Sequence, residues 1–374
     1  MKKVFLLLPA ALLLVSCDST EKSPLGTQEE TLALIRQVND AWQAAHSEPA
    51  NAFWHPAAYH TGNMAAYAAT GEERYRAYSE EWAEHNQWMG AKSPDPTEWK
   101  YSYGETDEYV LFGDWQTCFQ VYVDLDRVDP DNRKIARARE VMEYQMATPQ
   151  NDYWWWADGI YMAMPVMTRL HKVTGDPLYL EKMYDYFSFA RDMMYDGESR
   201  LFYRDAKYIY PEHKTANGGK DFWARGNGWV FAAYCRVLDD LPEEDPHREE
   251  YIRLYQEMAG ALIASQQEEG YWTRSMLDPE QAPGPETSGT AFFTYGFLWG
   301  INNGLLNKDN VLPTVEKAWA YLTRTALQPD GTLGYVQPIG ERAIPGQTID
   351  ARSTADFGVG AFLLAASELV KYLE

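Results

Sequence analysis

The sequence has 374 residues, and its 55 acidic and 33 basic side chains give a formal net charge of −22. So acidic a chain is a poor partner for nucleic acid, whose binding depends on Lys and Arg that neutralise phosphates. An anionic ligand would need a local group of cations, because the overall field repels it. The 14 tryptophans and 26 tyrosines suit the apolar faces of sugar rings, although large helical cores use them too.

Residues 1–16 are predicted to be a signal peptide. A basic start precedes the apolar run Val4–Val15, which is too short to span a bilayer. The small residues before Cys17 are typical of a bacterial lipoprotein signal, which predicts cleavage before Cys17 and lipid attachment there. Ordinary signal cleavage is the alternative. Residues 17–26 would then tether the protein to a membrane of the bacterial envelope, facing the periplasm or the outside.

Residues 27–374 are predicted to form one all-α domain, because helical periodicity dominates and strand signals are nearly absent. Helices with few charges, expected to be buried all round, fall near 56–69, 114–126, 159–173, 227–240, 288–303 and 354–373. Charged amphipathic helices, expected to cover them, fall near 27–42, 72–88, 131–147, 177–194, 246–267 and 309–327. Six helices of each kind predict two concentric rings, an (α/α)6 barrel around a central cavity. An irregular helical bundle is the alternative.

The long segments that lead into the buried helices are rich in Gly and Trp. We expect them to lie on one face and to carry function, while the outer ring is structural. They are residues 91–113, 148–158, 199–226, 270–287 and 331–353.

Cysteine and histidine usage predicts no metal site. The sequence has no CxxC and no HExxH motif, and its seven histidines are scattered. Cys118 and Cys235 fall in predicted apolar helices and are expected to be buried free thiols, with a disulfide as the alternative in an exported protein.

The segment Asp221–Trp229 places a cation among three aromatic rings and two glycines at the mouth of an apolar helix. Aromatic faces bind a ring, a guanidinium pairs with a carboxylate, and glycine lets the backbone approach closely. Trp223, Arg225 and Trp229 are therefore predicted to bind a flat, negatively charged ligand. The alternative is that Arg225 stacks on a ring for packing alone. The basic residues before this segment would add a local positive field; they are Arg204, Lys207, His213 and Lys214.

Asp158 stands at the mouth of a predicted inner helix, directly after Trp154-Trp155-Trp156-Ala157. A carboxylate among three tryptophans should be poorly solvated, which raises its pKa toward the range of a general acid. The alternative is a helix N-cap, for which the position is equally suited. Asp152 is the competing carboxylate nearby, and Met162 lies one turn along the same helix face.

A second carboxylate, Asp114, occupies the matching place before another inner helix. Two aspartates at adjacent helix mouths would face one cavity, as glycoside cleavage requires. N-capping is again the alternative for Asp114, and Asp107 and Glu108 are alternative carboxylates on the preceding segment.

Polar side chains also interrupt the first inner helix at Tyr59, His60 and Asn63, where the pattern expects apolar residues. We take these three as candidate substrate contacts. A histidine satisfied within the core is the alternative. Glu286, before Thr287-Ser288, is interpreted as a structural group at a helix entrance.

Four motifs occur in the order WWWADGIYMAMP, DFWARGNGWV, ETSGTAFFTYG and DFGVGAFLLA. With them the chain resembles glycoside hydrolase family 105, the unsaturated rhamnogalacturonyl hydrolases, over about residues 27 to 373. The resemblance implies an (α/α)6 catalytic domain that needs no metal or organic cofactor. It also implies the substrate, an oligosaccharide of rhamnogalacturonan or pectin type released by a polysaccharide lyase, whose terminal non-reducing uronic acid carries a C4=C5 double bond.

The resemblance further implies roles for individual residues. Asp158 matches the acid that protonates C4 and then helps water to add at C5, after which the hemiketal opens and the sugar is released. Asp114 matches a second carboxylate, and Met162 a pocket residue. The residues that match those holding the unsaturated uronate are Trp223, Arg225 and Trp229.

Two departures from the family pattern bear on the substrate. Leu201–Asp205 stands where better-known members place a histidine-containing stretch, and Trp115 replaces the second acid of a double-aspartate motif. Substrate choice could therefore differ from rhamnogalacturonan products. An unsaturated glucuronyl hydrolase acting on glycosaminoglycan, ulvan or arabinogalactan products is an alternative, because its uronate would meet Arg225 in the same way. A surface glycan-binding lipoprotein without catalysis is another. A sugar epimerase would usually have paired catalytic histidines, which the scattered histidines disfavour.

Overall fold

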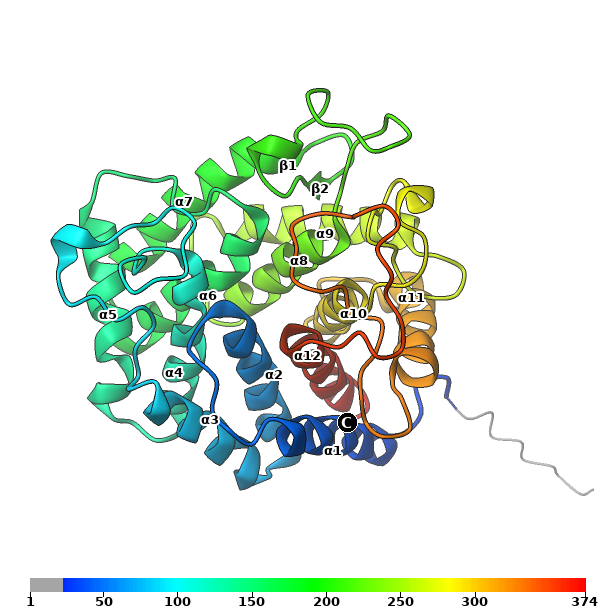
Figure 1. Ribbon diagram of the computed structural model, residues 1–374, viewed down its shortest axis with the longest axis horizontal. Coiled ribbons are helices and arrows are strands. Elements are labelled where there is room, and N and C mark those ends of the chain that lie inside the picture. Colours follow the sequence, from blue (N-terminus) through cyan, green and yellow to red (C-terminus); the bar gives the residue numbers. More distant parts are fainter. Residues whose placement is uncertain (1–22) are drawn as a thin grey trace, which may run out of the picture.

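The computed structural model describes residues 23–374, and this part of the chain folds into twelve α-helices arranged as a double ring (Figure 1). The predicted signal peptide and Cys17 lie outside the described residues. Within residues 23–374 the strands are limited to one short antiparallel hairpin, β1 (Tyr195–Asp196) and β2 (Leu201–Phe202).

Six helices form the inner ring of the described chain. Each contacts its neighbours in chain order, and the last returns to the first, so the ring is closed. These helices are buried nearly all round; in α10, for example, every residue from Thr287 to Gly300 is buried. The inner helices are α2 (Trp54–Thr70), α4 (Thr117–Val128), α6 (Ala157–Thr174), α8 (Ala224–Leu238), α10 (Thr287–Asn302) and α12 (Asp356–Tyr372).

The other six helices of the described chain cover this ring. Each outer helix buries one stripe, as α5 does with Ile135, Ala138, Val141 and Met142 at helical spacing. They are α1 (Gln28–Ala45), α3 (Glu73–His85), α5 (Asn132–Ala147), α7 (Leu178–Met194), α9 (Arg248–Ser265) and α11 (Lys308–Tyr321), which continues into the π-helical turn η5 (Leu322–Ala326). Helices α3, α5, α7, α9 and α11 pack on the inner helix that precedes each in the chain, and α1 packs on α12.

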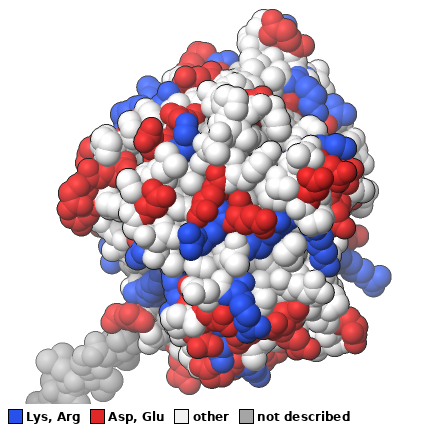
Figure 2. Space-filling model, turned by 90° about the vertical axis from the view of Figure 1, so that its left-hand side faces the viewer, with Lys and Arg blue, Asp and Glu red and all other residues white. Residues whose placement is uncertain are grey.

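The predicted (α/α)6 barrel is confirmed, and the irregular bundle is wrong, because the inner ring closes on itself. Cys118 and Cys235 are buried free thiols, as expected. No helix of residues 23–374 has the length and apolar character needed to cross a bilayer. Figure 2 shows acidic and basic side chains interspersed on one side of the molecule, so the acidic residues form no continuous patch there.

Three inner helices begin in the same way, and this places the long segments on one face. The first N–H of the helix donates to a backbone carbonyl in the next long segment. Ala157 donates to Arg204 (2.7 Å), Ala224 to Arg274 (2.9 Å) and Thr287 to Tyr335 (2.9 Å). Each helix entrance is thereby tied to the segment that follows it around the ring. In Figure 1 the orange-red segment, residues 331–353, runs beside α10 and α12.

The remaining short helices lie in the connections. They are the 3-10 turns η1 (Pro96–Glu98), η2 (Gly113–Trp115), η3 (Ala206–Tyr208) and η4 (Pro279–Gln281).

Candidate active site

A cavity of about 390 Å³ opens at the end of the barrel where the inner helices begin. Four of the five long segments contribute to its wall, and residues 270–287 do not. The rest of the wall comes from the entrance to α2, from Asp114 in the turn before α4 and from α6. The lining residues are Asn51, Phe53, Trp54, His55, Tyr103, Glu105, Asp114, Trp156, Asp158, Met162, Arg204, Ile339, Gly340 and Glu341.

Asp158 lies on the cavity wall as the second residue of α6. The N-cap of α6 is Trp156, so Asp158 does not serve as the cap. Its Oδ2 atom is buried without a hydrogen-bond partner and lies 3.5 Å from Nε of Arg204. Burial raises the pKa of Asp158, against the opposing charges of Arg204 and Arg225. An unpartnered oxygen and a raised pKa suit a proton donor, and the catalytic role of Asp158 stays a prediction.

Asp114 lies on the same wall, in the turn η2. The N-cap of α4 is Gln116, so capping does not explain this aspartate either. Burial raises the pKa of Asp114 well above its ordinary value, and the charge on Asp158 raises it further, while Arg204 opposes both effects. Two carboxyl groups in one poorly hydrated wall repel each other when both are ionised. One of them therefore keeps its proton to a higher pH.

The competing carboxylates named from the sequence have other partners and do not line the cavity. Asp152 accepts a hydrogen bond from the Tyr101 hydroxyl. Asp107 accepts from the backbone N–H of Lys92, and Glu108 pairs with Lys100. The structure thus brings together Asp114 and Asp158 and leaves the alternatives outside.

Met162 lines the cavity one helical turn after Asp158, as expected. Its sulfur accepts a hydrogen bond of 3.0 Å from the Thr117 hydroxyl, which fixes the thioether against α4. Met162 and Trp156 thus provide apolar wall beside the carboxylates.

The expectation that Tyr59, His60 and Asn63 contact a substrate in the cavity is wrong in this structure. Their side chains leave α2 on the opposite side, toward α1 and α3. Tyr59 donates to Asn39, His60 contacts Ser79, and Asn63 bonds to both of those residues. Burial lowers the pKa of His60 to about 3, so the ring is neutral, stacked on Trp82 with ring centroids 4.0 Å apart. This agrees with a histidine satisfied within the core.

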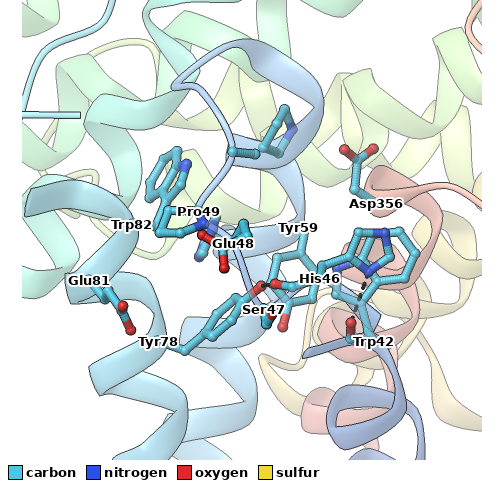
Figure 3. A pocket seen from close by; sticks show the side chains of 13 residues that line it. Trp42, His46, Ser47, Glu48, Pro49, Tyr59, Tyr78, Glu81, Trp82 and Asp356 are labelled. Carbon is cyan, nitrogen blue, oxygen red and sulfur yellow. Dashed lines mark hydrogen bonds between the residues drawn. The ribbon is translucent and has the colours of Figure 1, made fainter. Parts of the chain in front are cut away.

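Tyr59 and His60 instead line a smaller cavity of about 70 Å³ between α1, α2 and α3 (Figure 3). Trp42, Tyr78 and Trp82 form most of its aromatic wall. None of the candidate catalytic carboxylates lies in it. It is distinct from the cavity that contains Asp114 and Asp158.

The Trp223–Trp229 segment also differs from the expectation. Arg225 is fully buried and does not line the cavity. Its two terminal nitrogens donate to the carbonyls of Gln337 (2.7 Å) and Pro338 (2.9 Å), and its guanidinium lies 4.6 Å from the ring centroid of Trp223. Trp229 is buried against Tyr161. In this structure the packing alternative describes Arg225, and direct contact of these residues with a sugar stays a prediction.

Trp223 and Arg225 therefore act on the cavity indirectly. The Trp223 indole donates to the side chain of Gln337 (2.8 Å), and Gln337 in turn donates to the Arg342 carbonyl (2.8 Å). The motif anchors the segment whose next residues, 339–341, form part of the cavity wall. Glu286 holds the same region: it accepts from Ser288 and Gly289 as the N-cap of α10 and from the backbone of Gln337, which confirms its structural role.

Sequence reasoning missed several residues on the wall, among them His55, Glu105 and Glu341. His55 pairs with Asp356 at 2.6 Å across the entrances of α2 and α12. Glu341 pairs with Arg204 across the cavity mouth. The signal for His55 was its place in Trp54-His55-Pro56 at a helix entrance, beside an aromatic ring. Nothing local marks Glu341, because its partners lie far away in the chain.

Residues 23–374 contain no group of three or more His, Cys, Asp or Glu side chains that could hold a metal ion.

An aromatic-walled cavity with two carboxyl groups at raised pKa provides what acid–base cleavage of a sugar needs. The fold and the site together define an (α/α)6 barrel of the glycoside-processing class.

Comparison with known proteins identifies the family. The chain matches the model of Glycosyl Hydrolase Family 88 over residues 27–373. It is 34% identical over 345 residues to the unsaturated 3S-rhamnoglycuronyl hydrolase of Formosa agariphila, with 89% of each chain covered. The chain therefore belongs to glycosyl hydrolase family 88 and is a glycoside hydrolase of the unsaturated uronyl hydrolase type.

Two solved structures are more similar still. A structure named as a glycosyl hydrolase family 88 from Bacteroides vulgatus is 61% identical, with a TM-score of 0.91, over 93% of this chain and 100% of that one. One named as a polysaccharide lyase is 62% identical, with a TM-score of 0.91, over 92% of this chain and 98% of that one. Structures named as members or possible members of family 105 are 18% identical, which shows the shared fold alone. The matching family description is thus 88 rather than the 105 of the sequence resemblance.

Proposed function

We propose that this enzyme removes an unsaturated uronic acid from the non-reducing end of oligosaccharides released by polysaccharide lyases. The observation that carries the proposal is the cluster of Asp158, Asp114 and Arg204 on one cavity wall. A planar uronate brings a double bond to be protonated and a negative charge to be neutralised. The two aspartates answer the first need and the guanidinium the second.

The proposed reaction consumes one water. Asp158 gives its proton to C4, and the positive charge left at C5 is shared with O5 as an oxocarbenium ion. Water adds at C5, losing a proton to the Asp158 carboxylate, so that the acid is restored and a hemiketal forms. The hemiketal opens between C5 and O5, and the hemiacetal left at C1 releases the second sugar as its alcohol. The double bond is lost without any other reactant.

The role of Asp158 as the acid needs a physical reason, because burial and repulsion shift the pKa of Asp114 further upward. Arg204 supplies one. Its charge, together with that of Arg225, limits the rise in the pKa of Asp158, so this carboxyl can both give up a proton and take one back, as the two steps require. Asp114 would stay as its neighbour and orient the attacking water.

For the second sugar, we infer rhamnose. The relative from Formosa agariphila is named for a rhamnoglycuronyl substrate. The resemblance to rhamnogalacturonyl hydrolases also supports rhamnose as the sugar next to the uronate. Pectin-type and ulvan-type lyase products share this disaccharide pattern and the same unsaturated uronate, because elimination removes the stereocentre at C4; they differ in how the uronate is joined to rhamnose. Products of glycosaminoglycans, which the sequence also left open, lack the rhamnose.

The test is a screen of lyase-digested pectin, ulvan, arabinogalactan, heparin and chondroitin with the ultraviolet absorbance of the conjugated double bond as readout. We expect absorbance to decay with at least one rhamnose-containing digest. Unchanged absorbance with every digest, together with measurable binding, would instead indicate a glycan-binding protein without catalysis.

A lyase is the second candidate, because a structure 62% identical to this chain is named as a polysaccharide lyase. A lyase forms the C4=C5 bond by removing the C5 proton and expelling the group at C4, and it therefore increases the same absorbance. Intact, saturated polysaccharides should thus be included in the screen. The sign of the absorbance change decides between the two activities.

We also propose that the mature protein is a lipoprotein of the bacterial envelope, attached through Cys17. The basis is the signal pattern of residues 1–16. In bacteria, Cys17→Ser should abolish incorporation of labelled fatty acid and release the protein from the membrane fraction. Release of the unchanged protein by salt alone would contradict the lipid anchor.

A further inference from the structure

Arg204 is held so that one side of its guanidinium faces Asp158 and another faces the cavity mouth. The Arg204 carbonyl accepts the first N–H of α6 (2.7 Å), which ties this residue to the helix that carries Asp158. Buried Asp205 accepts from Nη1 of Arg204 (2.6 Å) and from the backbone N–H of Lys207 (2.8 Å). Arg204 and the following turn, η3, are therefore fixed in position before any ligand binds.

Three donors converge in front of this turn on one carboxylate, that of Glu341. Its Oε2 atom lies 3.3 Å from Nη1 of Arg204 and 3.0 Å from Nζ of Lys207. Its Oε1 atom accepts from the Tyr208 hydroxyl at 2.7 Å. Burial raises the pKa of Glu341, but these donors outweigh it and the net shift is downward. The group thus stays ionised and occupies a complete oxyanion site.

The position of Glu341 indicates that its carboxylate can leave this site. It comes from the far segment 331–353, its side chain is 43% exposed, and its neighbour Ile339 is 62% exposed. The segment is anchored at Gln337 and Pro338 by Arg225 and at the Arg342 carbonyl by Gln337, so residues 339–341 form a short loop between fixed points. Rotation of the Glu341 side chain alone would withdraw its carboxylate from all three donors.

The structure assigns Arg204, Lys207 and Tyr208 as an anion subsite for a carboxylate or sulfate group of the oligosaccharide, which Glu341 fills in the free enzyme and yields when substrate binds. The assignment deepens the proposed function and rests on it for the identity of the ligand. It gives Lys207 and Tyr208, which lie outside the cavity wall, a part in substrate selection. It also gives Arg204 the anion-binding role that buried Arg225 does not fill in this structure.

The first experiment needs no turnover. Binding of inorganic sulfate to the full enzyme is followed by tryptophan fluorescence, since Trp155 lies under the Arg204 guanidinium at 5.8 Å. Glu341→Gln removes the competing charge and should tighten sulfate binding about tenfold, whereas Lys207→Met should weaken it by a similar factor. The matched controls are Glu212→Gln and Lys214→Met, both exposed in the same long segment as Lys207. Equal sulfate affinity in wild type, Glu341→Gln and Lys207→Met would overturn the assignment.

The second experiment identifies the group that the subsite takes. Turnover is compared on one unsaturated uronyl disaccharide with and without a sulfate ester on its second sugar. Lys207→Met should raise KM about tenfold with little change in kcat. If both substrates are affected equally, the subsite takes the uronate carboxylate; if only the sulfated one is affected, it takes the sulfate. An unchanged KM for both would overturn the assignment even where wild-type turnover supports the proposed function.

Discussion

The entrances of α6 and α8 share one local pattern and do different work. The first reads Trp156-Ala157-Asp158-Gly159 and the second Trp223-Ala224-Arg225-Gly226. In each, the tryptophan is the N-cap and the alanine N–H pairs with the carbonyl of an arginine in the next long segment. The charged residue that follows faces an open cavity in α6 but is covered by the carbonyls of residues 337 and 338 in α8.

The difference shows that the local motif sets the direction of the side chain, and the neighbouring segment decides what it meets. Asp158 is left with an unpartnered oxygen and a raised pKa, which suits proton transfer. Arg225 has its terminal nitrogens bonded and supports the wall. The same local pattern therefore supports the proposed chemistry at α6 and the structure of the cavity wall at α8.

The largest expected effect concerns the open entrance. Asp158→Asn removes the proposed proton donor and should lower kcat about 10³-fold. The measurement is the decay of ultraviolet absorbance on an unsaturated disaccharide, with Asp152→Asn as control, since that carboxylate bonds to Tyr101 outside the cavity. Full activity in Asp158→Asn would remove Asp158 from the reaction.

The pH dependence sharpens the same point. The proposed reaction needs protonated Asp158, and burial raises its pKa, so activity should persist above the range of an ordinary aspartic acid and fall as pH passes the raised value. Arg204 opposes this rise, so in Arg204→Met the pKa of Asp158 should rise further and the loss of activity should move to higher pH. A pH–rate profile unchanged by Arg204→Met would show that the guanidinium does not act on Asp158.

Substitution of Arg225 at the covered entrance, that of α8, should lower the stability of the folded protein. Arg225→Met leaves the carbonyls of Gln337 and Pro338 without their partner and should lower the free energy of unfolding by about 2–4 kcal/mol. Arg204→Met should cost less, about 1–3 kcal/mol, because it leaves buried Asp205 without its guanidinium partner but borders the cavity. Urea unfolding followed by tryptophan fluorescence gives both values. An Arg225→Met protein of normal stability with a raised KM would instead support the direct sugar contact predicted from the sequence.

A third comparison tests the feature that the two entrances share. A Cβ atom at Gly159 or Gly226 would come within 3.0 Å or 2.9 Å of the tryptophan ring three residues earlier. Alanine at either glycine should therefore destabilise the protein by roughly 1–3 kcal/mol. Gly260→Ala is the control, because that exposed glycine in α9 has nothing within 4 Å, and alanine should stabilise the helix by roughly 0.5–1 kcal/mol. Equal effects at Gly226 and Gly260 would show that the ring contact is unimportant.

The smallest expected effect is an increase in thermal stability. The folded pKa of Asp114 is raised, so the unfolded chain loses this proton at lower pH than the folded one. The resulting loss of stability is absent below the ordinary pKa of aspartic acid, grows between the ordinary and the raised pKa, and is constant above it. Asp114→Asn should therefore raise Tm at neutral pH by roughly 2–4 °C. Differential scanning calorimetry across pH should show the gain shrink toward acidic pH. A gain that is constant with pH would point to packing rather than charge.

The sequence was sufficient to predict the barrel because charge content separates inner from outer helices, and the six repeats of that pattern leave one closed arrangement. It also placed Asp114 and Asp158 together, since both precede inner helices. It could not orient Tyr59, His60 and Asn63. An inner helix is buried on every side, so its composition does not distinguish the face toward the cavity from the face toward α1 and α3.

The partner of Arg225 was beyond local reasoning for a different reason. An arginine beside tryptophans has the same local pattern whether it awaits a ligand or is already bonded. Its actual partners lie 112 and 113 positions away, in a segment without regular secondary structure. Glu341 was missed on the same ground, 137 positions from Arg204.

The closure of the inner ring by α12 has a consequence for how the chain reaches this structure. Helix α12 contacts α2 and α10 within the ring and α1 outside it, so the last helix joins the earliest part of the chain. Before α12 docks, both neighbours expose apolar flanks, and the pairing that covers them spans most of the polypeptide. Contacts of such long sequence separation form slowly. Folding should therefore be limited by this final docking step. Until it occurs, the inner ring is open between α10 and α2, and its apolar flanks are accessible to proteases and chaperones.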